Sequence, residues 1–364
     1  MAPGQYRFEV TSGGVFFGPS RMLDLTVRPG APVDAKVQLA RLFDPRTSGW
    51  YGADLHHHAD QAEGVTPPDD LARSQLAAGL DFLFVSDHDS TANHAKLQAI
   101  ADRRGVPFIA SMEISPSWGH FNAWPLSPQG QALAIDTSTA TIDQVLGEAR
   151  RQGAIVVQSN HPYIPYGYLA SVAAGVAPGG FNPGFDLLEV NGDVPSNPEV
   201  IATLHRLWNA GHRYYLSGGT DVHDVWNHES GAVRLFAHLD GAPTPVAFAA
   251  AVQAGHAYVS FGPLIRPGVM FGSDLKVKAG ARLALPFDLH SVPGLRQATL
   301  IGGGAAVASK TFDGAPREAR AEFEVGPGAR TWYSIEVEDV DGRKAFSNPI
   351  WVDVVESPVA AGAR

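Results

Sequence analysis

The stretch YGADLHHHADQAEG, residues 51–64, places three consecutive histidines at the end of an apolar segment. Side chains of a β-strand point alternately to opposite faces, so we expect His56 and His58 to share one face and His57 to point the other way. Two imidazoles on one strand face, two residues apart, can bind one metal ion. We expect His57 to pack or to form hydrogen bonds beneath the strand.

Acidic and imidazole side chains also follow later apolar segments. They are Asp87 and His88 in VSDHDS, Glu113 in SMEIS with His120 shortly after it, His161 in QSNHPY, and Asp221 and His223 in GGTDVHD. In α/β barrels the active site lies at the C-terminal ends of the strands, so we expect these side chains to meet. Imidazole and carboxylate ligands without sulfur suit Zn²⁺, Mn²⁺ or Fe. The pattern therefore predicts a site for more than one metal ion.

Composition narrows the possible partners. The chain has 364 residues, of which 45% are hydrophobic and 18% charged, with a net charge of -10. An acidic chain disfavours nucleic acid and anionic membrane as partners, because both reward clustered lysine and arginine. A small-molecule substrate is the expected partner, and the oligomeric state stays open. The absence of cysteine excludes disulfides, zinc–thiolate sites and a cysteine nucleophile.

The cellular location stays open as well. The N-terminus has no signal-peptide pattern, but an upstream leader could have been removed, so a periplasmic location is compatible with the sequence. We find no apolar run of the ~20 residues that a transmembrane helix needs.

The chain divides into three predicted regions. Residues 1–48 contain short strand-like runs and too little core to fold alone, so we expect them to pack on the rest. Residues 49–263 alternate strands and helices, which favours a parallel barrel. Residues 264–364 alternate apolar and polar residues between glycine and proline turns, which is typical of a β-sandwich-like module. Helices are expected at 66–80, where Thr66 is the N-cap, and at 91–104, 141–152, 197–210 and 245–254.

The motifs resemble those of a known family. DLHHH, SDHD, the glutamate of SMEIS, NHP and TDVH resemble the polymerase-and-histidinol-phosphatase (PHP) metallohydrolases. More narrowly, GWYGADLHHHAD, FVSDHD, WGHFNAW, GGTDVHD and AGHAYVSFGP resemble the CehA/McbA-like branch, which is associated with carbaryl hydrolysis. The similarity covers roughly residues 49–263 and, more loosely, the C-terminal module. It implies an α/β fold with a distorted (β/α)7 PHP-type barrel, a flanking β-sandwich-like module, and two or three divalent ions.

The resemblance also implies which residues bind those ions. The implied ligands are His56, His58, Asp87 or His88 or both, Glu113 as a bridging carboxylate, His120, His161, Asp221 and His223. Glu113, His161 and Asp221 are also the expected catalytic residues. Many family members continue from the first motif with threonine and then Ser-Asp-Gly, whereas this chain has Ala59 and then Ala62-Glu63-Gly64. Glu63 either replaces that aspartate as a ligand or marks a position that has lost the role.

The amidohydrolase superfamily is the main rival, because it also opens with two histidines on the first barrel strand. Its two-metal members usually bridge the ions with a carbamylated lysine. This chain has no lysine between Lys96 and Lys276, so no internal strand can supply one. Glu113 is the expected bridge instead, which favours the PHP-like interpretation.

The expected reaction is hydrolysis by a metal-bound hydroxide. The segments beside the ligands contain no arginine or lysine to hold a phosphate but are rich in aromatic residues, which favours a neutral ester, carbamate or amide substrate. The side chains expected to line the pocket are His94, Trp118, Asn122, Tyr163, Asn191 and Trp226. The alternatives are a PHP-type phosphoesterase, in which the more distant Arg213 or Arg234 reaches the phosphate, and a metal-binding scaffold without catalysis. A binding protein whose β module carries the function is also left open.

Overall fold

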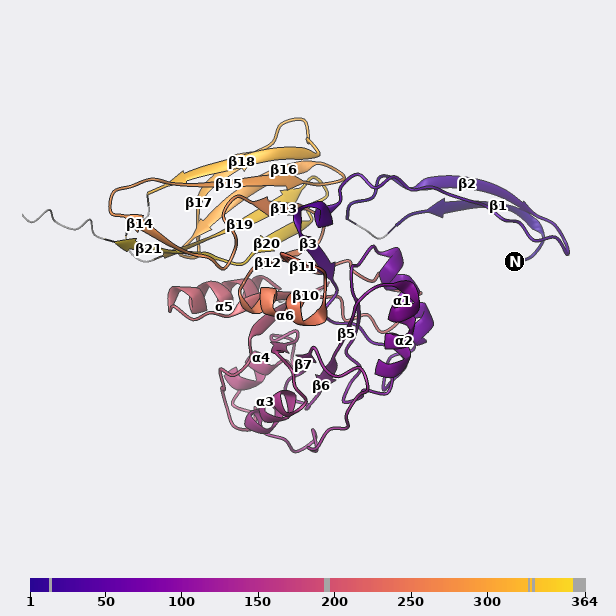
Figure 1. The fold of residues 1–364 in the computed structure, drawn as a ribbon, viewed down its shortest axis with the longest axis horizontal. Coiled ribbons are helices and arrows are strands. Elements are labelled where there is room, and N and C mark those ends of the chain that lie inside the picture. Colours follow the sequence, from indigo (N-terminus) through magenta and orange to yellow (C-terminus); the bar gives the residue numbers. More distant parts are fainter. Residues whose placement is uncertain (13–14, 193–196, 327, 329–330, 356–364) are drawn as a thin grey trace, which may run out of the picture.

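A computed structural model of the chain describes residues 1–12, 15–192, 197–326, 328 and 331–355. Figure 1 shows a part that carries the helices, a β-rich part stacked against it, and a two-stranded ribbon that projects to one side. No helix among the described residues is both long and apolar enough to cross a membrane. The helices are η1 (Pro45–Ser48, a 3₁₀ turn), α1 (Pro68–Ala77), α2 (His94–Arg104), α3 (Ile142–Arg151), α4 (Tyr168–Ala173), α5 (Asn197–Asn209) and α6 (Pro245–Gln253).

Five of these helices lie within the ranges expected from the sequence. The start of α1 differs, because Pro67 is its N-cap residue and Pro68 its first residue. The hydroxyl of Thr66 donates to the carbonyl oxygen of His223 instead, so this buried side chain ties two loops together. The α4 helix was not predicted, because six residues are too few for a helical period to be visible.

The helix-bearing part contains ten short strands. They are β3 (Trp50–Ala53), β4 (Leu83–Val85), β5 (Phe108–Ala110), β6 (Met112–Ile114), β7 (Phe121–Trp124), β8 (Val156–Ser159), β9 (Leu187–Asn191), β10 (Tyr215–Gly219), β11 (Arg234–His238) and β12 (Ala257–Ser260). Five of them form a sheet in the order β10-β9-β8-β7-β6, and β4 pairs with β5. Every residue of β8, β9 and β10 is buried, as expected for central strands covered on both faces.

The strand pairing is not that of a uniform (β/α)7 barrel. The β8–β9 and β9–β10 pairs are parallel, but β7 runs antiparallel to both β6 and β8. The strands of this part belong to three separate sheets within the described residues. The architecture is therefore a mixed α/β part joined to a β-rich part, and closure of a regular barrel stays a prediction.

The β-rich part continues one of these sheets. Its strands are β13 (Leu264–Pro267), β14 (Asp274–Lys278), β15 (Leu283–His290), β16 (Leu295–Gly302), β17 (Ala305–Thr311), β18 (Glu318–Val325), β19 (Thr331–Asp339), β20 (Lys344–Ser347) and β21 (Ile350–Val355). A nine-stranded sheet runs β14-β21-β19-β20-β12-β11-β3, with β16 attached to β19 and β17 attached to β16, while β13, β15 and β18 form a second sheet. Because β12 pairs with β20, hydrogen bonds cross the boundary that we predicted at residue 263.

Two hydrophobic cores follow from this arrangement. The first fills the α/β part and includes Phe84, Phe121 and Leu188. The second lies in the β-rich part, yet Trp50 and Tyr258 from the α/β part are members of it. The two parts therefore share buried surface as well as a sheet.

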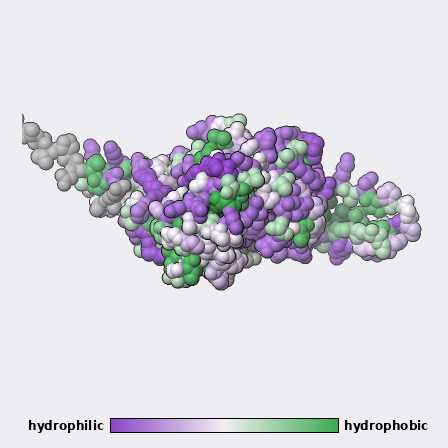
Figure 2. Space-filling model, turned by 90° about the horizontal axis from the view of Figure 1, so that it is seen from below, coloured by the Kyte–Doolittle hydropathy of each residue, from purple (hydrophilic) through white to green (hydrophobic). Residues whose placement is uncertain are grey.

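The N-terminal 48 residues are divided between a packed loop and a projecting ribbon. The ribbon pairs β1 (Gly4–Val10) with β2 (Arg21–Val27), and Figures 1 and 2 show it extending from the body with apolar side chains on it. In the loop between the two strands, Phe16 is only 2% exposed and belongs to the second core. Outside β1 and β2, the strand-like runs of this region reduce to isolated bridges in the described residues, such as Phe17 to Arg41. We expected all of 1–48 to pack on the rest, whereas the ribbon itself does not.

Candidate metal centre

The three histidines follow β3 and lie beside the loop that follows β10. The backbone N–H of His58 donates to the carbonyl oxygen of Val222 (2.9 Å), and that of Asp221 donates to the carbonyl oxygen of His56 (2.8 Å). Asp221 adopts a left-handed backbone conformation with φ 59°, an uncommon and costly choice for a residue other than glycine. This local geometry brings the side chains of two distant motifs together.

The side chains alternate as the sequence predicts. His56 Nε2 lies 3.2 Å from Glu113 Oε1 and 3.0 Å from Asp221 Oδ1, and His58 Nε2 lies 3.1 Å from the same Asp221 oxygen. The imidazole of His57 lies elsewhere, with Nε2 at 2.8 Å from Ser230 Oγ. His56 and His58 therefore contribute to one cluster and His57 does not.

The sequence offers nine candidate metal ligands, with the role of Glu63 left open. Eight of the nine lie together in one cluster. Their ligand atoms form four groups, within each of which the atoms lie no more than 4.8 Å apart. The groups are His58/His88/His223, His56/His161/Asp221, His56/His58/Glu113 and His88/Glu113/His120. Glu113, His56, His58 and His88 each belong to two groups, which is the arrangement needed to hold neighbouring ions.

The donor atoms fit a bound cation. His58 Nδ1, His120 Nδ1, His161 Nδ1 and Glu113 Oε2 are buried without a correctly oriented hydrogen-bond partner. Buried polar atoms are almost always satisfied, so unsatisfied lone pairs gathered at one place need another partner. Imidazole nitrogens and carboxylate oxygens are the ligands that divalent metal ions take in proteins. The residues present therefore suit divalent ions.

The electrostatics of the cluster also favour added positive charge. Burial alone would raise the pKa of Glu113, but His56, His120 and His161 hold it well below its ordinary value. Burial would likewise lower the pKa of His56, but Asp221, Glu189 and Glu113 raise it well above the usual range. Ionised carboxylates are thus buried here only because cationic partners face them.

Glu63 lies at the edge of the cluster. Its Oε1 is 3.0 Å from His88 Nε2 and 3.5 Å from His223 Nε2, while 70% of its side chain is exposed. It is not a member of the four groups, so its ligand role stays a proposal.

Of the alternatives Asp87 and His88, His88 lies in the cluster and Asp87 lies beside it. One carboxylate oxygen accepts from the backbone N–H of Ala59 (2.7 Å) and the other from Asn93 Nδ2 (2.7 Å). Both oxygens are thus occupied by the protein, and Asp87 does not belong to the four groups. Burial raises the pKa of this carboxyl group to about 6. Asp87 holds the loop after His58 in place beside the cluster.

Two buried residues that support the cluster were missed from the sequence. Glu189 Oε1 lies 2.8 Å from His56 Nδ1, and its Oε2 accepts from the backbone N–H of His161. Asn160 Nδ2 donates to Glu113 Oε1 (2.7 Å). A lone acid inside the apolar strand LLEVN, and an asparagine directly before a predicted ligand, were the available signals.

Comparisons with known proteins agree with this geometry. No family model matches the chain. A solved two-domain protein from Bacteroides vulgatus, which contains a predicted PHP-like metal-dependent phosphoesterase, superposes with a TM-score of 0.50 at 15% identity, over 84% of this chain and 95% of that one. The chain has a PHP-like fold.

Two curated relatives match shorter stretches. A 3',5'-nucleoside bisphosphate phosphatase of Chromobacterium violaceum is 33% identical over 105 residues, 28% of this chain and 36% of that protein. A 5'-3' exoribonuclease of Haemophilus influenzae is 34% identical over 65 residues, 18% of this chain and 24% of that protein. The matches thus span about a third and a quarter of these relatives.

Within the PHP-like fold, the residues expected to line a pocket serve mainly as packing. Both ring nitrogens of His94 face backbone carbonyl oxygens, those of Ser111 and Ser127, and burial lowers the pKa of this histidine. Trp118 is 7% exposed, and its Nε1–H donates to the carbonyl oxygen of Ala140. The structure differs from the expectation for His94 and Trp118, because the ring nitrogens of both side chains contact backbone carbonyl oxygens inside the protein.

Three of the remaining four also make internal hydrogen bonds, and the fourth is exposed. Asn122 is buried and donates to the carbonyl oxygen of Leu55, and Asn191 donates to Glu189. The hydroxyl of Tyr163 pairs with that of Thr203. Trp226 is 62% exposed and so does not form an enclosed wall. The polar atoms of Asn122, Asn191 and Tyr163 are thus used in contacts within the protein, and a substrate-binding role for the exposed Trp226 stays a proposal.

Tyr166 is the aromatic residue that does border the cluster. Its ring centroid lies 5.5 Å from that of His120 and 5.7 Å from that of His161, and the residue is 50% exposed. Burial, with Asp221 and Glu63 nearby, raises the pKa of its hydroxyl. Its position in NHPYIPYGY, five residues after His161, was the available signal.

The two distant arginines point elsewhere. The guanidinium of Arg234 is buried and donates to the carbonyl oxygens of Gly231 and Ala78. Arg213 forms an ion pair with Asp274 on the β-rich part. The contacts of both arginines are thus made away from the metal cluster.

Proposed function

We propose that this protein is a metal-dependent phosphoesterase that uses two or three divalent ions, Zn²⁺, Mn²⁺ or Fe. One observation carries the proposal: nitrogen atoms of five imidazoles lie within 3.5 Å of the Glu113 carboxylate. They belong to His56 (3.2 Å), His58 (3.5 Å), His88 (2.9 Å), His120 (3.3 Å) and His161 (3.5 Å). A buried carboxylate ringed by imidazoles is the donor set of a bridged multi-metal site.

Divalent ions held there would polarise a phosphoryl oxygen and lower the pKa of a bound water. The chain's own residues hold and orient these ions. Glu113 and Asp221 supply the negative charge, and Glu189 fixes the ring of His56 so that Nε2 faces the cluster. Asn160 donates to one oxygen of Glu113 and so restrains the proposed bridge. Tyr166, at the open side, is positioned to contact the substrate.

Two findings support a phosphate ester over a neutral ester. The PHP-like fold is shared with a protein that contains a predicted metal-dependent phosphoesterase, and a partial relative is a nucleoside bisphosphate phosphatase. In addition, of the three aromatic side chains expected to line the pocket, Trp118 is packed inside the protein and Tyr163 is partly buried. The phosphoesterase alternative of the sequence analysis thus becomes the main proposal.

One observation favours a second candidate function, which is hydrolysis of a neutral ester or carbamate as in the CehA/McbA-like branch. The contacts of Arg213 and Arg234 lie elsewhere, so neither supplies the side-chain fork that holds phosphate oxygens in many phosphatases. Metal charge would then have to bind the phosphate by itself.

The test compares p-nitrophenyl phosphate, bis-p-nitrophenyl phosphate and naphthyl acetate at matched loading with Zn²⁺, Mn²⁺ or Fe. We expect kcat/KM for one of the phosphate esters to exceed that for naphthyl acetate by about tenfold or more, equivalent to roughly 1.4 kcal/mol. Chelation should abolish turnover and readdition of metal should restore it. Glu113→Gln should lower metal content and rate together. Preference for the acetate under every loading would establish the second candidate instead.

A further inference from the structure

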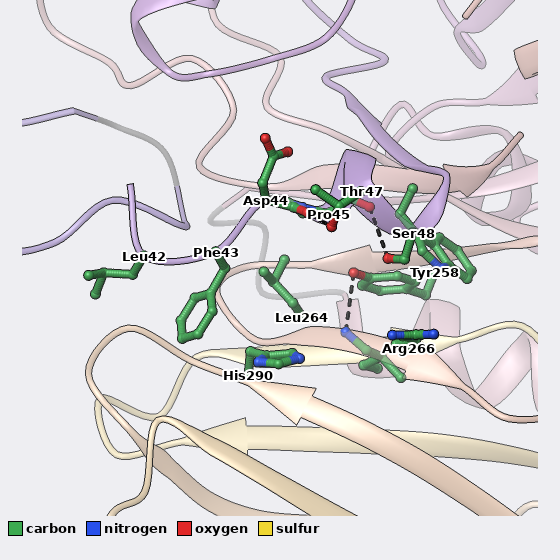
Figure 3. A pocket seen from close by; sticks show the side chains of 12 residues that line it. Leu42, Phe43, Asp44, Pro45, Thr47, Ser48, Tyr258, Leu264, Arg266 and His290 are labelled. Atoms are coloured by element: carbon green, nitrogen blue, oxygen red, sulfur yellow. Dashed lines mark hydrogen bonds between the residues drawn. The ribbon is translucent and has the colours of Figure 1, made fainter. Parts of the chain in front are cut away.

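A cavity of about 270 Å³ lies at the junction of the three predicted regions. Residues 42–48, which we name the strap, cover the face of the β13–β15 pair there. Figure 3 shows Asp44, Thr47 and Ser48 of the strap on one side and Arg266 and His290 of the β strands on the other. The lining residues are Leu42, Phe43, Asp44, Pro45, Thr47, Ser48, Trp50, Tyr258, Leu264, Ile265, Arg266 and His290. None of them belongs to the metal cluster.

The charge on the cavity wall is not balanced. Arg266 has no carboxylate within ion-pair distance among the residues that the structure describes. Asp288, directly opposite it across the β13–β15 pair, is bound by Arg320 at 3.1 Å. Asp44, the acid that lines the cavity, is bound by Arg46 at 2.7 Å and by Arg41 at 3.2 Å. The cavity therefore has one cation available to a ligand and no free acid.

Aromatic rings form much of the remaining wall. The rings of Phe43 and His290 pack with their centroids 4.9 Å apart, and those of Trp50 and Tyr258 are 5.1 Å apart. Leu264, 4% exposed, adds an apolar surface. The hydroxyls of Thr47 and Ser48 donate to backbone carbonyl oxygens of the strap, so their protons are already used within the protein. Beside the exposed Arg266, a ligand would meet the partly exposed rings of Phe43 and His290, while Trp50 and Tyr258 lie almost fully buried beneath them.

The volume limits what fits. The cavity of about 270 Å³ is large enough to take a small ligand with a single ring. We propose that it binds a small aromatic carboxylate about the size of benzoate, with the carboxylate on Arg266 and the ring against the aromatic wall. An arginine fork matches a carboxylate in two parallel hydrogen bonds, and ring faces pack favourably on one another. This binding site is separate from the proposed phosphoesterase site and does not depend on it.

The test is calorimetric titration of the full metal-loaded chain with benzoate. We expect saturable binding that Arg266→Gln weakens about tenfold or more, because a charge-assisted interaction is lost. The matched control is Arg282→Gln, which changes an exposed arginine paired with Glu324 on the same β-rich part and should leave benzoate affinity unchanged. Phe43→Ala should also weaken binding, by loss of the ring contact.

Two further arms separate this site from other anion sites. Inorganic phosphate should not displace benzoate, because the ring contributes part of the affinity. His58→Ala, which removes a proposed metal ligand, should keep benzoate binding. The inference is overturned if the intact protein shows no saturable benzoate binding. Equal affinity of Arg266→Gln, displacement by phosphate, or loss of binding in His58→Ala would each overturn it too.

Discussion

His56, His57 and His58 are neighbours in sequence, but each meets a different chemical environment. His56 is held by Glu189 on one nitrogen and faces Glu113 and Asp221 with the other. His58 has a buried nitrogen without a hydrogen-bond partner, and His57 is tied to Ser230. Strand alternation alone separates the middle histidine from the other two.

This separation predicts different consequences of substitution. His58→Ala should lower metal content and reduce turnover by about 100-fold or more, since a ligand is lost. His57→Ala should keep the metal and cost about 1–3 kcal/mol of unfolding free energy, because it removes a buried ring and its hydrogen bond to Ser230. Metal analysis, phosphate-ester turnover and urea unfolding of both variants measure this. Equal metal loss in the two variants would contradict the strand-face argument.

Glu189 predicts a second, indirect effect. Glu189→Gln should weaken metal affinity by about 10–100-fold, because the carboxylate that orients a metal-binding histidine is replaced by a neutral group. Competition with a coloured chelator measures this affinity. Glu199→Gln, an exposed acid in the first turn of α5, is the control and should leave affinity unchanged. A normal affinity in Glu189→Gln would remove its assigned role.

The sequence predicts the residues that face the proposed metal ions better than the residues that hold those side chains in place. Imidazoles and acids at strand ends stand out in an apolar sequence, so eight of the expected ligands were located together. The choice between Asp87 and His88 could not be made from the sequence, because the sequence does not show that Ala59 and Asn93 donate to the two oxygens of Asp87. Glu189 was missed because its role depends on the sheet order β8-β9-β10, which local patterns do not encode.

At the scale of elements, the projecting ribbon is anchored at its closed end. Phe16, in the loop between β1 and β2, packs beneath the guanidinium of Arg41 at 4.8 Å and lies in the second core. A two-stranded ribbon alone is marginally stable in water. The loop, and not the pairing of β1 with β2, therefore fixes this segment to the body.

This anchoring predicts unequal effects for two phenylalanines. Phe16→Ala should lower the unfolding free energy by about 3 kcal/mol or more, as large-to-small substitutions in a core do. Phe8→Ala, on the ribbon, should cost less than about 1 kcal/mol, because the ribbon covers little core. Urea unfolding followed by tryptophan fluorescence compares the two. A larger loss for Phe8→Ala would show that the ribbon itself is the anchor.

Asp81 lies in the turn before β4 and binds the backbone of β3. Its burial predicts that the stability of the protein depends on pH. Its carboxylate accepts from the backbone N–H of Gly52 at 2.8 Å, and burial raises its pKa to about 6. A carboxyl group with a raised folded-state pKa favours the protonated protein. Its contribution is therefore lost as pH rises from about 4 to about 6, by up to about 3 kcal/mol.

Asp81→Asn isolates this effect, because asparagine stays neutral but can still accept from Gly52. The unfolding free energy of Asp81→Asn, minus that of the natural chain, should increase as the pH is raised from about 4 to about 7. Asp69→Asn, an exposed acid near Lys96, is the control and should show a constant difference. A pH-independent difference for Asp81→Asn would exclude the effect.

At the scale of the whole molecule, the α/β part and the β-rich part share structure that neither completes alone. The nine-stranded sheet passes from β3 through β12 to β20, with Val259 opposite Phe346. The backbone N–H of Leu216, in β10, donates to Asn348 Oδ1 in the β-rich part. Composition and periodicity predict a change of architecture near residue 263, but they do not reveal that one sheet runs across it.

The last prediction concerns the three predicted regions, 1–48, 49–263 and 264–364. Truncation after residue 263 would expose the edge of β12 and uncover Trp50, Phe236 and Tyr258, which belong to the second core. An unpaired strand edge beside exposed apolar side chains promotes aggregation. We therefore expect the truncated chain to be insoluble or to bind a hydrophobic dye, and the full chain to unfold in one calorimetric transition. A soluble 1–263 fragment with full metal content and phosphate-ester turnover would show instead that the regions are independent domains.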